Sequence, residues 1–127
     1  MREYAQAAKM REALRLFERR TEEVTAAQRL TPRIYQLLLM IKTSRTNDER
    51  ASLTELEERL QLGKSTVTEL VLRAEKRGLL HRELDRERGR GISISLSATG
   101  QRRLATTLAE LGDERRRLSN ILGRRVT

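Results

Sequence analysis

The segment from Lys64 to Arg77 combines small hydroxyl side chains with basic ones in a helical pattern. Val67, Leu70 and Ala74 recur with helical spacing, together with Val71, so these side chains share one buried face. The opposite face is left with Lys64, Ser65, Thr66, Thr68, Glu69 and Arg73. Small hydrogen-bonding groups near the start of a helix suit entry into the major groove of DNA, about 12 Å wide, and contact with base edges. The residues predicted to read bases are Ser65, Thr66, Thr68 and Glu69.

A second candidate feature is the charged turn 85–91, DRERGRG, which lies between two short stretches with strand character. Its arginines are Arg86, Arg88 and Arg90. Such a loop can follow the phosphate backbone or reach into the minor groove, where the negative potential favours arginine. A solvated helix face and a solvated turn would explain each feature separately, but their order along the chain favours DNA binding. The residues predicted to position phosphates are Lys64, Arg73, Ser52 and Thr54.

Composition agrees with a nucleic-acid partner and argues against several other classes. The formal net charge is +9, and most of the basic excess lies after residue 63. The absence of cysteine excludes a disulfide framework, a cysteine zinc site and thiol redox chemistry. We find no phosphate-binding glycine loop, nucleophile elbow or metal-ligand motif, so we expect neither an enzyme nor a bound metal or cofactor. No apolar run approaches the roughly 18 residues of a membrane span, and the charged N-terminus is unlike a secretory signal. A cytoplasmic, nucleoid-associated location is expected.

The elements before the candidate helix must hold it in place. Residues 2–27 form a long amphipathic helix with one narrow apolar stripe, which is typical of a helix that packs on another helix. Thr31 and Pro32 predict the start of a buried helix that runs to about Ile41. Residues 42–51 are polar and indicate a loop, and Ser52 with Glu55 matches a capping box that opens a short helix. Together with the Lys64–Arg77 helix, this short helix forms a helix-turn-helix.

The elements after the candidate helix complete a wing and a second helical region. Gly78 is a natural helix end, residues 79–84 and the alternating ISISL of 92–96 predict a β-hairpin, and Ser97 caps a further helix. The expected order is therefore four helices, two strands and two helices. The predicted fold is mainly α with a small β-hairpin wing (α+β), as a single domain over 1–127. The DNA-binding lobe is 31–97, and the helical dimerisation region is 1–28 with 98–127.

The combination of LTPRIYQLL, KSTVTELV, EKRGLLHR and ISLSATG, spread between Leu30 and Gly100, resembles the MarR family of winged-helix transcriptional regulators. The resemblance implies an obligate homodimer, with one recognition helix and one wing of each protomer on a half-site of double-stranded DNA. The residues expected at the dimer interface are Met10, Leu14, Phe17, Leu118, Ile121 and Leu122. It also implies a pocket for a small-molecule effector between the dimer region and the lobe. Tyr4 and Tyr35 are candidates to line it, although a core or interface role is favoured.

Two departures from the family pattern bear on the expected function. Glu69 stands where the family very often has arginine, and the wing reads Asp-Arg-Glu-Arg-Gly-Arg instead of Asp-Pro-x-Asp-Arg-Arg. A glutamate can accept a hydrogen bond from a cytosine amine or can simply repel phosphate. We therefore expect a sequence-specific regulator, most readily a repressor reading a pseudo-palindromic operator. A winged-helix protein–protein adaptor and a non-specific architectural DNA binder are the alternatives.

Overall fold

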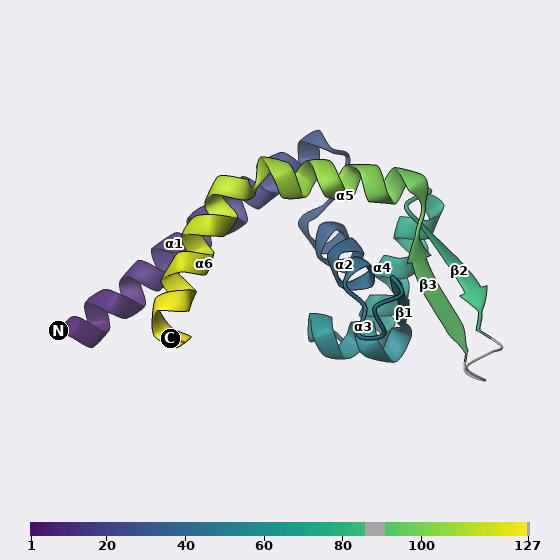
Figure 1. The fold of residues 1–127 in the computed structure, drawn as a ribbon, viewed down its shortest axis with the longest axis horizontal. Coiled ribbons are helices and arrows are strands. Elements are labelled where there is room, and N and C mark those ends of the chain that lie inside the picture. Colours follow the sequence, from purple (N-terminus) through teal and green to yellow (C-terminus); the bar gives the residue numbers. More distant parts are fainter. Residues whose placement is uncertain (86–90, 127) are drawn as a thin grey trace.

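In the computed structural model, which describes residues 1–85 and 91–126, two long helical arms carry a small lobe of helices and a sheet (Figure 1). The helices are α1 (Arg2–Ala27), α2 (Pro32–Lys42), α3 (Leu53–Leu60), α4 (Lys64–Lys76), α5 (Ala98–Glu110) and α6 (Gly112–Val126). The strands are β1 (Arg50–Ser52), β2 (Leu80–Leu84) and β3 (Ile92–Leu96). The predicted mainly α class is confirmed. Among the described residues, no helix is long and apolar enough to cross a membrane.

The core of the lobe is built around α2. Ile34, Leu37, Leu38 and Ile41 have no exposed surface, and α2 packs against α3, α4, α5, β1 and β3. The nearly continuous apolar run in the sequence predicted this burial, since a helix that is apolar on most sides must be covered on most sides. Burying each such side chain contributes about 1.5–3 kcal/mol. The other elements are therefore held in place largely by their contacts with α2.

Side-chain caps fix where most of the lobe's helices begin. The N–H of Ile34 donates to Thr31 Oγ1 at 3.1 Å, and the N–H of Glu55 donates to Ser52 Oγ at 3.1 Å. The N–H of Gly100 donates to Ser97 Oγ at 3.0 Å. All three caps were predicted from the sequence, and each satisfies a first-turn N–H that has no partner within the helix.

The sheet differs from the prediction, because the expected two-stranded hairpin has a third strand. β1 pairs with β3 in antiparallel register, with Ala51 opposite Ile94, and the strand order is β1-β3-β2. We expected residues 42–51 to form only a loop, and that expectation was wrong at its C-terminal end. The strand has three residues, too few for an alternating pattern, and only Ala51 is buried. Its pairing with β3 comes from a long-range contact that the local sequence does not encode.

A hydrogen-bonded triangle holds the loop before β1 against α2 and α5. Lys42 Nζ donates to Glu49 Oε1 at 2.9 Å and to Gln101 Oε1 at 3.0 Å, and Gln101 Nε2 donates to Glu49 Oε1 at 3.1 Å. These hydrogen bonds lower the pKa of the Glu49 carboxyl below its usual value, because they favour its charged form. Glu49 therefore fixes this polar loop to both α2 and α5.

The junction between α4, β2 and α5 is tightly packed. Ser97 Oγ donates to the carbonyl oxygen of Gly78 at 2.6 Å, and the N–H of Ser97 donates to the carbonyl oxygen of Leu79 at 3.0 Å. A Cβ added at Gly100 would overlap the same Leu79 carbonyl, so only glycine allows this close approach of α5 to the start of β2. The junction joins the lobe to the arms through backbone contacts.

The arms consist of α1 and α6, which lie side by side with the two termini at the same end of the molecule (Figure 1). An ion pair between Arg20 Nε and Glu114 Oε1, at 3.3 Å, links the two helices. Leu16 is 66% exposed and Leu122 is 45% exposed. The arms therefore leave some apolar side chains on their surface.

Candidate nucleic-acid interface

The predicted helix-turn-helix consists of α3, a short turn and α4. Gln61 ends α3 in the left-handed conformation (φ 56°), and Leu62 then packs against the core. Gly63 precedes α4 in an extended conformation, with φ −70° and ψ 161°. The two helices contact each other directly, and α4 also contacts α2. This packing fixes the orientation of α4 in the lobe.

The two faces of α4 divide as the spacing predicted. Val67, Leu70, Val71 and Ala74 are buried. Lys64, Ser65, Glu69 and Arg73 are exposed, whereas Thr66 and Thr68 are half-buried. The predicted base-reading side chains therefore lie together on the outer, N-terminal part of one helix. Whether they contact bases stays a prediction.

The first turn of α4 has no side-chain cap, because Gly63 stands at its N-cap position. The starts of α2, α3 and α5 differ, since each is capped by a hydroxyl. The N–H groups of the first turn of α4 are therefore open to an external acceptor. Such N–H groups, together with the helix dipole, favour a phosphate oxygen.

Acidic side chains pair with two of the basic groups near this surface. Arg73 Nη2 lies 3.9 Å from Glu69 Oε1 one helical turn earlier, and Arg82 Nε lies 3.0 Å from Glu75 Oε2. An exposed pair of this kind contributes little energy and can exchange for another partner. Glu69 thus offsets part of the charge that Arg73, a predicted phosphate contact, brings to the surface.

The remaining predicted contacts lie on α3 and on the wing. Ser52 and Thr54 are exposed at the start of α3, but Ser52 Oγ already accepts the N–H of Glu55, so only its hydroxyl proton is left to donate. On the wing, the N–H of Asp85 donates to the carbonyl oxygen of Gly91 at 3.0 Å and closes the base of the turn. Arg86, Arg88 and Arg90 lie outside the described residues.

Residues 30–91, which contain this helix-turn-helix and most of the wing, match the sequence model of the MarR family. This segment belongs to the MarR family. The resemblance seen in the sequence is confirmed.

Solved structures of MarR-family proteins share the fold over most of the chain. Wild-type MarR from E. coli has a TM-score of 0.73 at 16% identity, over 90% of this chain and 82% of that one. A cysteine-to-serine mutant of the same protein, complexed with operator DNA, has a TM-score of 0.72 at 16% identity, over 90% and 79%. AbsC from Streptomyces coelicolor has a TM-score of 0.73 at 20% identity, over 87% and 76%. At these identities the likeness is one of fold. No curated protein matches the chain in sequence.

Arg59 connects the MarR-type helix-turn-helix to the rest of the lobe, and sequence reasoning missed it. Its Nη1 donates to the carbonyl oxygens of Met40 at 2.8 Å and Thr43 at 3.0 Å, at the C-terminal end of α2. The same atom lies 3.1 Å from Glu55 Oε2. The Glu55 carboxylate also accepts the N–H of Arg45 at 2.9 Å. Arg59 therefore caps α2 and orients α3, and only its i,i+4 spacing from Glu55 was visible in the sequence.

A pocket of about 310 Å³ lies between the arms and the lobe. It is lined by Phe17, Glu18, Thr21, Glu22, Pro32, Tyr35, Gln36, Leu39, Leu108 and Arg115. Burial raises the pKa of the Tyr35 hydroxyl above its usual value, and the nearby Arg115 charge opposes that rise. Tyr35 is thus both a core residue and part of the pocket wall, whereas Tyr4 is 78% exposed and belongs to neither.

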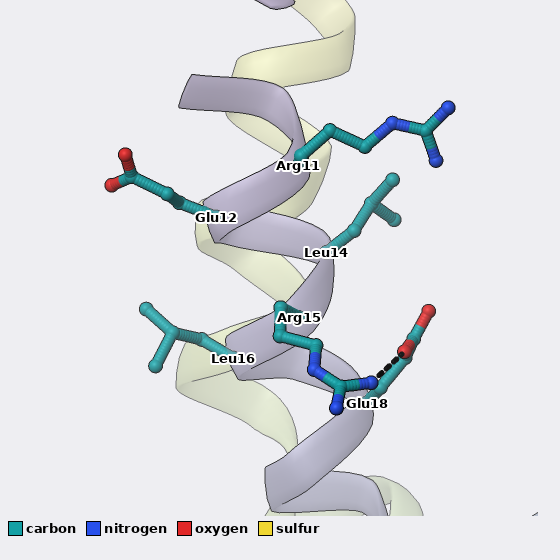
Figure 2. A pocket seen from close by; sticks show the side chains of 6 residues that line it. All are labelled: Arg11, Glu12, Leu14, Arg15, Leu16 and Glu18. Carbon is teal, nitrogen blue, oxygen red and sulfur yellow. Dashed lines mark ion pairs between the residues drawn. The ribbon is translucent and has the colours of Figure 1, made fainter. Parts of the chain in front are cut away.

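The outer side of α1 carries a shallower hollow of about 690 Å³. Figure 2 shows Leu14 and Leu16 on either side of Arg15, whose Nη1 lies 3.7 Å from Glu18 Oε2. Met10 and Leu14 are half-buried by the rest of the chain, as are Phe17, Leu118 and Ile121. Apolar and charged side chains are thus mixed on this part of the arm.

Replacing Arg59 with alanine is expected to destabilise the fold by about 2–3 kcal/mol, because it removes hydrogen bonds to two carbonyls and leaves the buried Glu55 carboxylate without its cation. Equilibrium unfolding in urea measures the change. Arg45→Ala is the matched control, since its ion pair with Glu58 is exposed and should be worth no more than about 1 kcal/mol. Equal losses in the two variants would contradict the role given to Arg59.

Proposed function

We propose that the protein is a sequence-specific, double-stranded DNA-binding transcriptional regulator that acts as a homodimer. The observation that carries this proposal is the outer N-terminal face of α4, which combines small hydroxyls and an exposed lysine with an uncapped first turn. The MarR-family match of residues 30–91 supports it. So does the shared fold with E. coli MarR, which has been solved with operator DNA.

In this proposal α4 enters the major groove. Ser65, Thr66 and Thr68 hydrogen-bond to base edges, while Lys64 and the open N–H groups of the first turn hold a phosphate. The Glu69 carboxylate can only accept hydrogen bonds, so its base partner would be the amino group of cytosine. Binding would then free Arg73 from Glu69 to reach the backbone, with Ser52 and Thr54 on the neighbouring phosphates. The wing arginines Arg86, Arg88 and Arg90 would contact the DNA in the flanking groove.

The domain organisation follows the same division. Residues 31–97 would form the DNA-binding lobe, and 1–28 with 98–127 the dimerisation region. A two-fold axis through the arms would place two α4 helices on half-sites about one helical turn apart, which makes the operator a pseudo-palindrome. A regulator of this geometry represses when its operator overlaps a promoter, and we propose repression as its action.

Ser65→Ala and Thr66→Ala are each expected to weaken binding to the selected operator by about 5–100-fold and to relax base preference at one position, because each removes a base contact. Duplexes selected from a random pool, followed by gel shift, provide the measurement. Lys64→Ala should instead weaken all duplexes alike. Thr106→Ala, an exposed hydroxyl on α5, is the control and should change nothing.

The salt dependence of wild-type binding belongs to the same experiment. If the dimer neutralises roughly 6–10 phosphates, affinity should fall by about 10³–10⁵ between 50 and 200 mM salt. Duplex binding without any sequence preference would identify a non-specific architectural DNA binder. The absence of duplex binding would favour the winged-helix protein–protein adaptor. Either result would refute the proposed function.

Leu122→Glu is expected to convert the dimer to a monomer at micromolar concentration, because it places a carboxylate in the proposed apolar interface of the arms. Leu122 is already 45% exposed in the single protomer, so the change should not affect its folding. Sedimentation velocity measures the mass. Leu84→Glu, at an exposed leucine of the wing, is the matched control and should stay dimeric. A wild-type chain that sediments as a monomer would contradict the proposal directly.

We further propose that the pocket beside Tyr35 takes a small effector that releases the DNA. Its volume of about 310 Å³ and its largely apolar wall suit a small aromatic molecule. Glu18 and Glu22 also line it, so a carboxylate on that molecule would have to face Arg115, the cation among the lining residues. Benzoate is therefore expected to weaken operator binding in a gel-shift titration, and Arg115→Gln to reduce that response. Arg116→Gln, whose guanidinium pairs with Asp113, is the control. Release that persists unchanged in Arg115→Gln would place the effector elsewhere.

A further inference from the structure

A hollow of about 510 Å³ lies at the opposite end of α4 from the proposed DNA-reading face. Arg29, Leu30 and Thr31 line it from the turn between α1 and α2, Arg77 from the end of α4, and Arg103 from α5. We call it the arginine hollow. Three arginine residues from three separate parts of the fold thus line one space.

Among the described residues, the charges of these arginines are not balanced by ion pairs. Within 1–85 and 91–126, no carboxylate forms an ion pair with Arg29, Arg77 or Arg103, whereas other arginines are paired. Three positive side chains around one space favour the binding of an anion between them. Guanidinium groups also match the oxygens of phosphate in a two-pronged geometry.

Arg29 ends α1 in the left-handed conformation, as Gln61 does at the end of α3. The N–H of Leu30 donates to the carbonyl oxygen of Thr25 at 2.8 Å, and the N–H of Arg29 donates to the carbonyl oxygen of Ala26 at 3.1 Å. These two hydrogen bonds form a Schellman motif at the end of α1. The end of α4 has the same motif, but there the left-handed position is Gly78 (φ 73°). Arg29 adopts φ 57° at the equivalent position, where glycine carries no steric penalty. Helix termination alone would be served better by glycine.

Thr31 supplies a polar group of the required kind. Its Oγ1 accepts the N–H of Ile34 as the cap of α2, so its hydroxyl proton is left to donate to an anion. The N-terminus of α2 adds its positive dipole end at the same place. Every polar side chain that lines the arginine hollow can therefore donate to an oxyanion.

The arginine hollow is too far along α4 to share a phosphate with the first turn. Arg77 follows Lys64 by 13 residues, which corresponds to about 20 Å along a helix. We propose that the arginine hollow binds a small phosphate-bearing solute, separately from DNA and from the pocket beside Tyr35. Such an anion would join α1, α4 and α5 through hydrogen bonds to Arg29, Arg77 and Arg103.

The test is calorimetric titration of the full-length protein with inorganic phosphate, at constant ionic strength maintained with sodium chloride. Saturable binding is expected in the wild type. Arg29→Gly and Arg103→Gln should each weaken it by about tenfold or more, because each removes charge-assisted hydrogen bonds. Arg29→Gly should not lower the Tm, because glycine suits the left-handed position. Arg102→Gln, one residue away on α5 and outside the hollow, is the matched control.

Three results would overturn this inference. These are no saturable phosphate binding in the wild type, binding retained in both Arg29→Gly and Arg103→Gln, or an equal loss in Arg102→Gln. A duplex titration without phosphate tests the other source of the same chemistry. Arg29→Gly should leave duplex affinity within about twofold, whereas a loss as large as that of Lys64→Ala would assign the hollow to a nucleic-acid backbone. The phosphate titration tests the arginine hollow whether or not the protein binds DNA, so the two proposals can fail separately.

Discussion

The burial of α2 is the constraint on which the rest of the lobe depends. Its side chains Ile34, Leu37, Leu38 and Ile41 are wholly removed from solvent, and this requires cover from helices on several sides and from the sheet. The helices that provide the cover have one apolar face each, so their polar faces must point outward. The outward face of α4 is therefore a by-product of core packing. The identity of the side chains on that face is free to serve recognition.

Charge is distributed around this core in two ways. Arg59 and Glu55 are engaged internally, where they fix the end of α2 to α3 through carbonyl and carboxylate contacts. The basic groups at the two ends of α4 have a different environment: Lys64 and Arg77 have no carboxylate partner among the described residues. A helix with unsatisfied cationic groups at both ends can engage an anion at either end. The protein thus separates the charges that hold the fold from those that are available to ligands.

Local sequence rules predicted what is local in the fold. Thr31, Ser52 and Ser97 cap the helices they were expected to cap, and the spacing of Val67, Leu70 and Ala74 identified the buried face of α4. What could not be predicted depends on contacts between distant segments. The β1 strand exists because β3 pairs with it, and Arg59 acts through carbonyls some 16 to 19 residues away. The arginine hollow is assembled from the turn between α1 and α2, the end of α4, and α5. No periodicity marks such residues.

The contact at Gly100 limits how the molecule can change shape. The backbone of α5 lies against the carbonyl of Leu79 with no side chain between them, and Ser97 clamps the same junction by hydrogen bonds to Gly78 and Leu79. This close backbone contact and the two hydrogen bonds of Ser97 fix the direction in which α5 leaves the sheet. The break between α5 and α6 at Leu111 is different, since there the helix is interrupted by a single residue. A change in the angle between the arms and the lobe would therefore need less rearrangement at Leu111 than at Gly100.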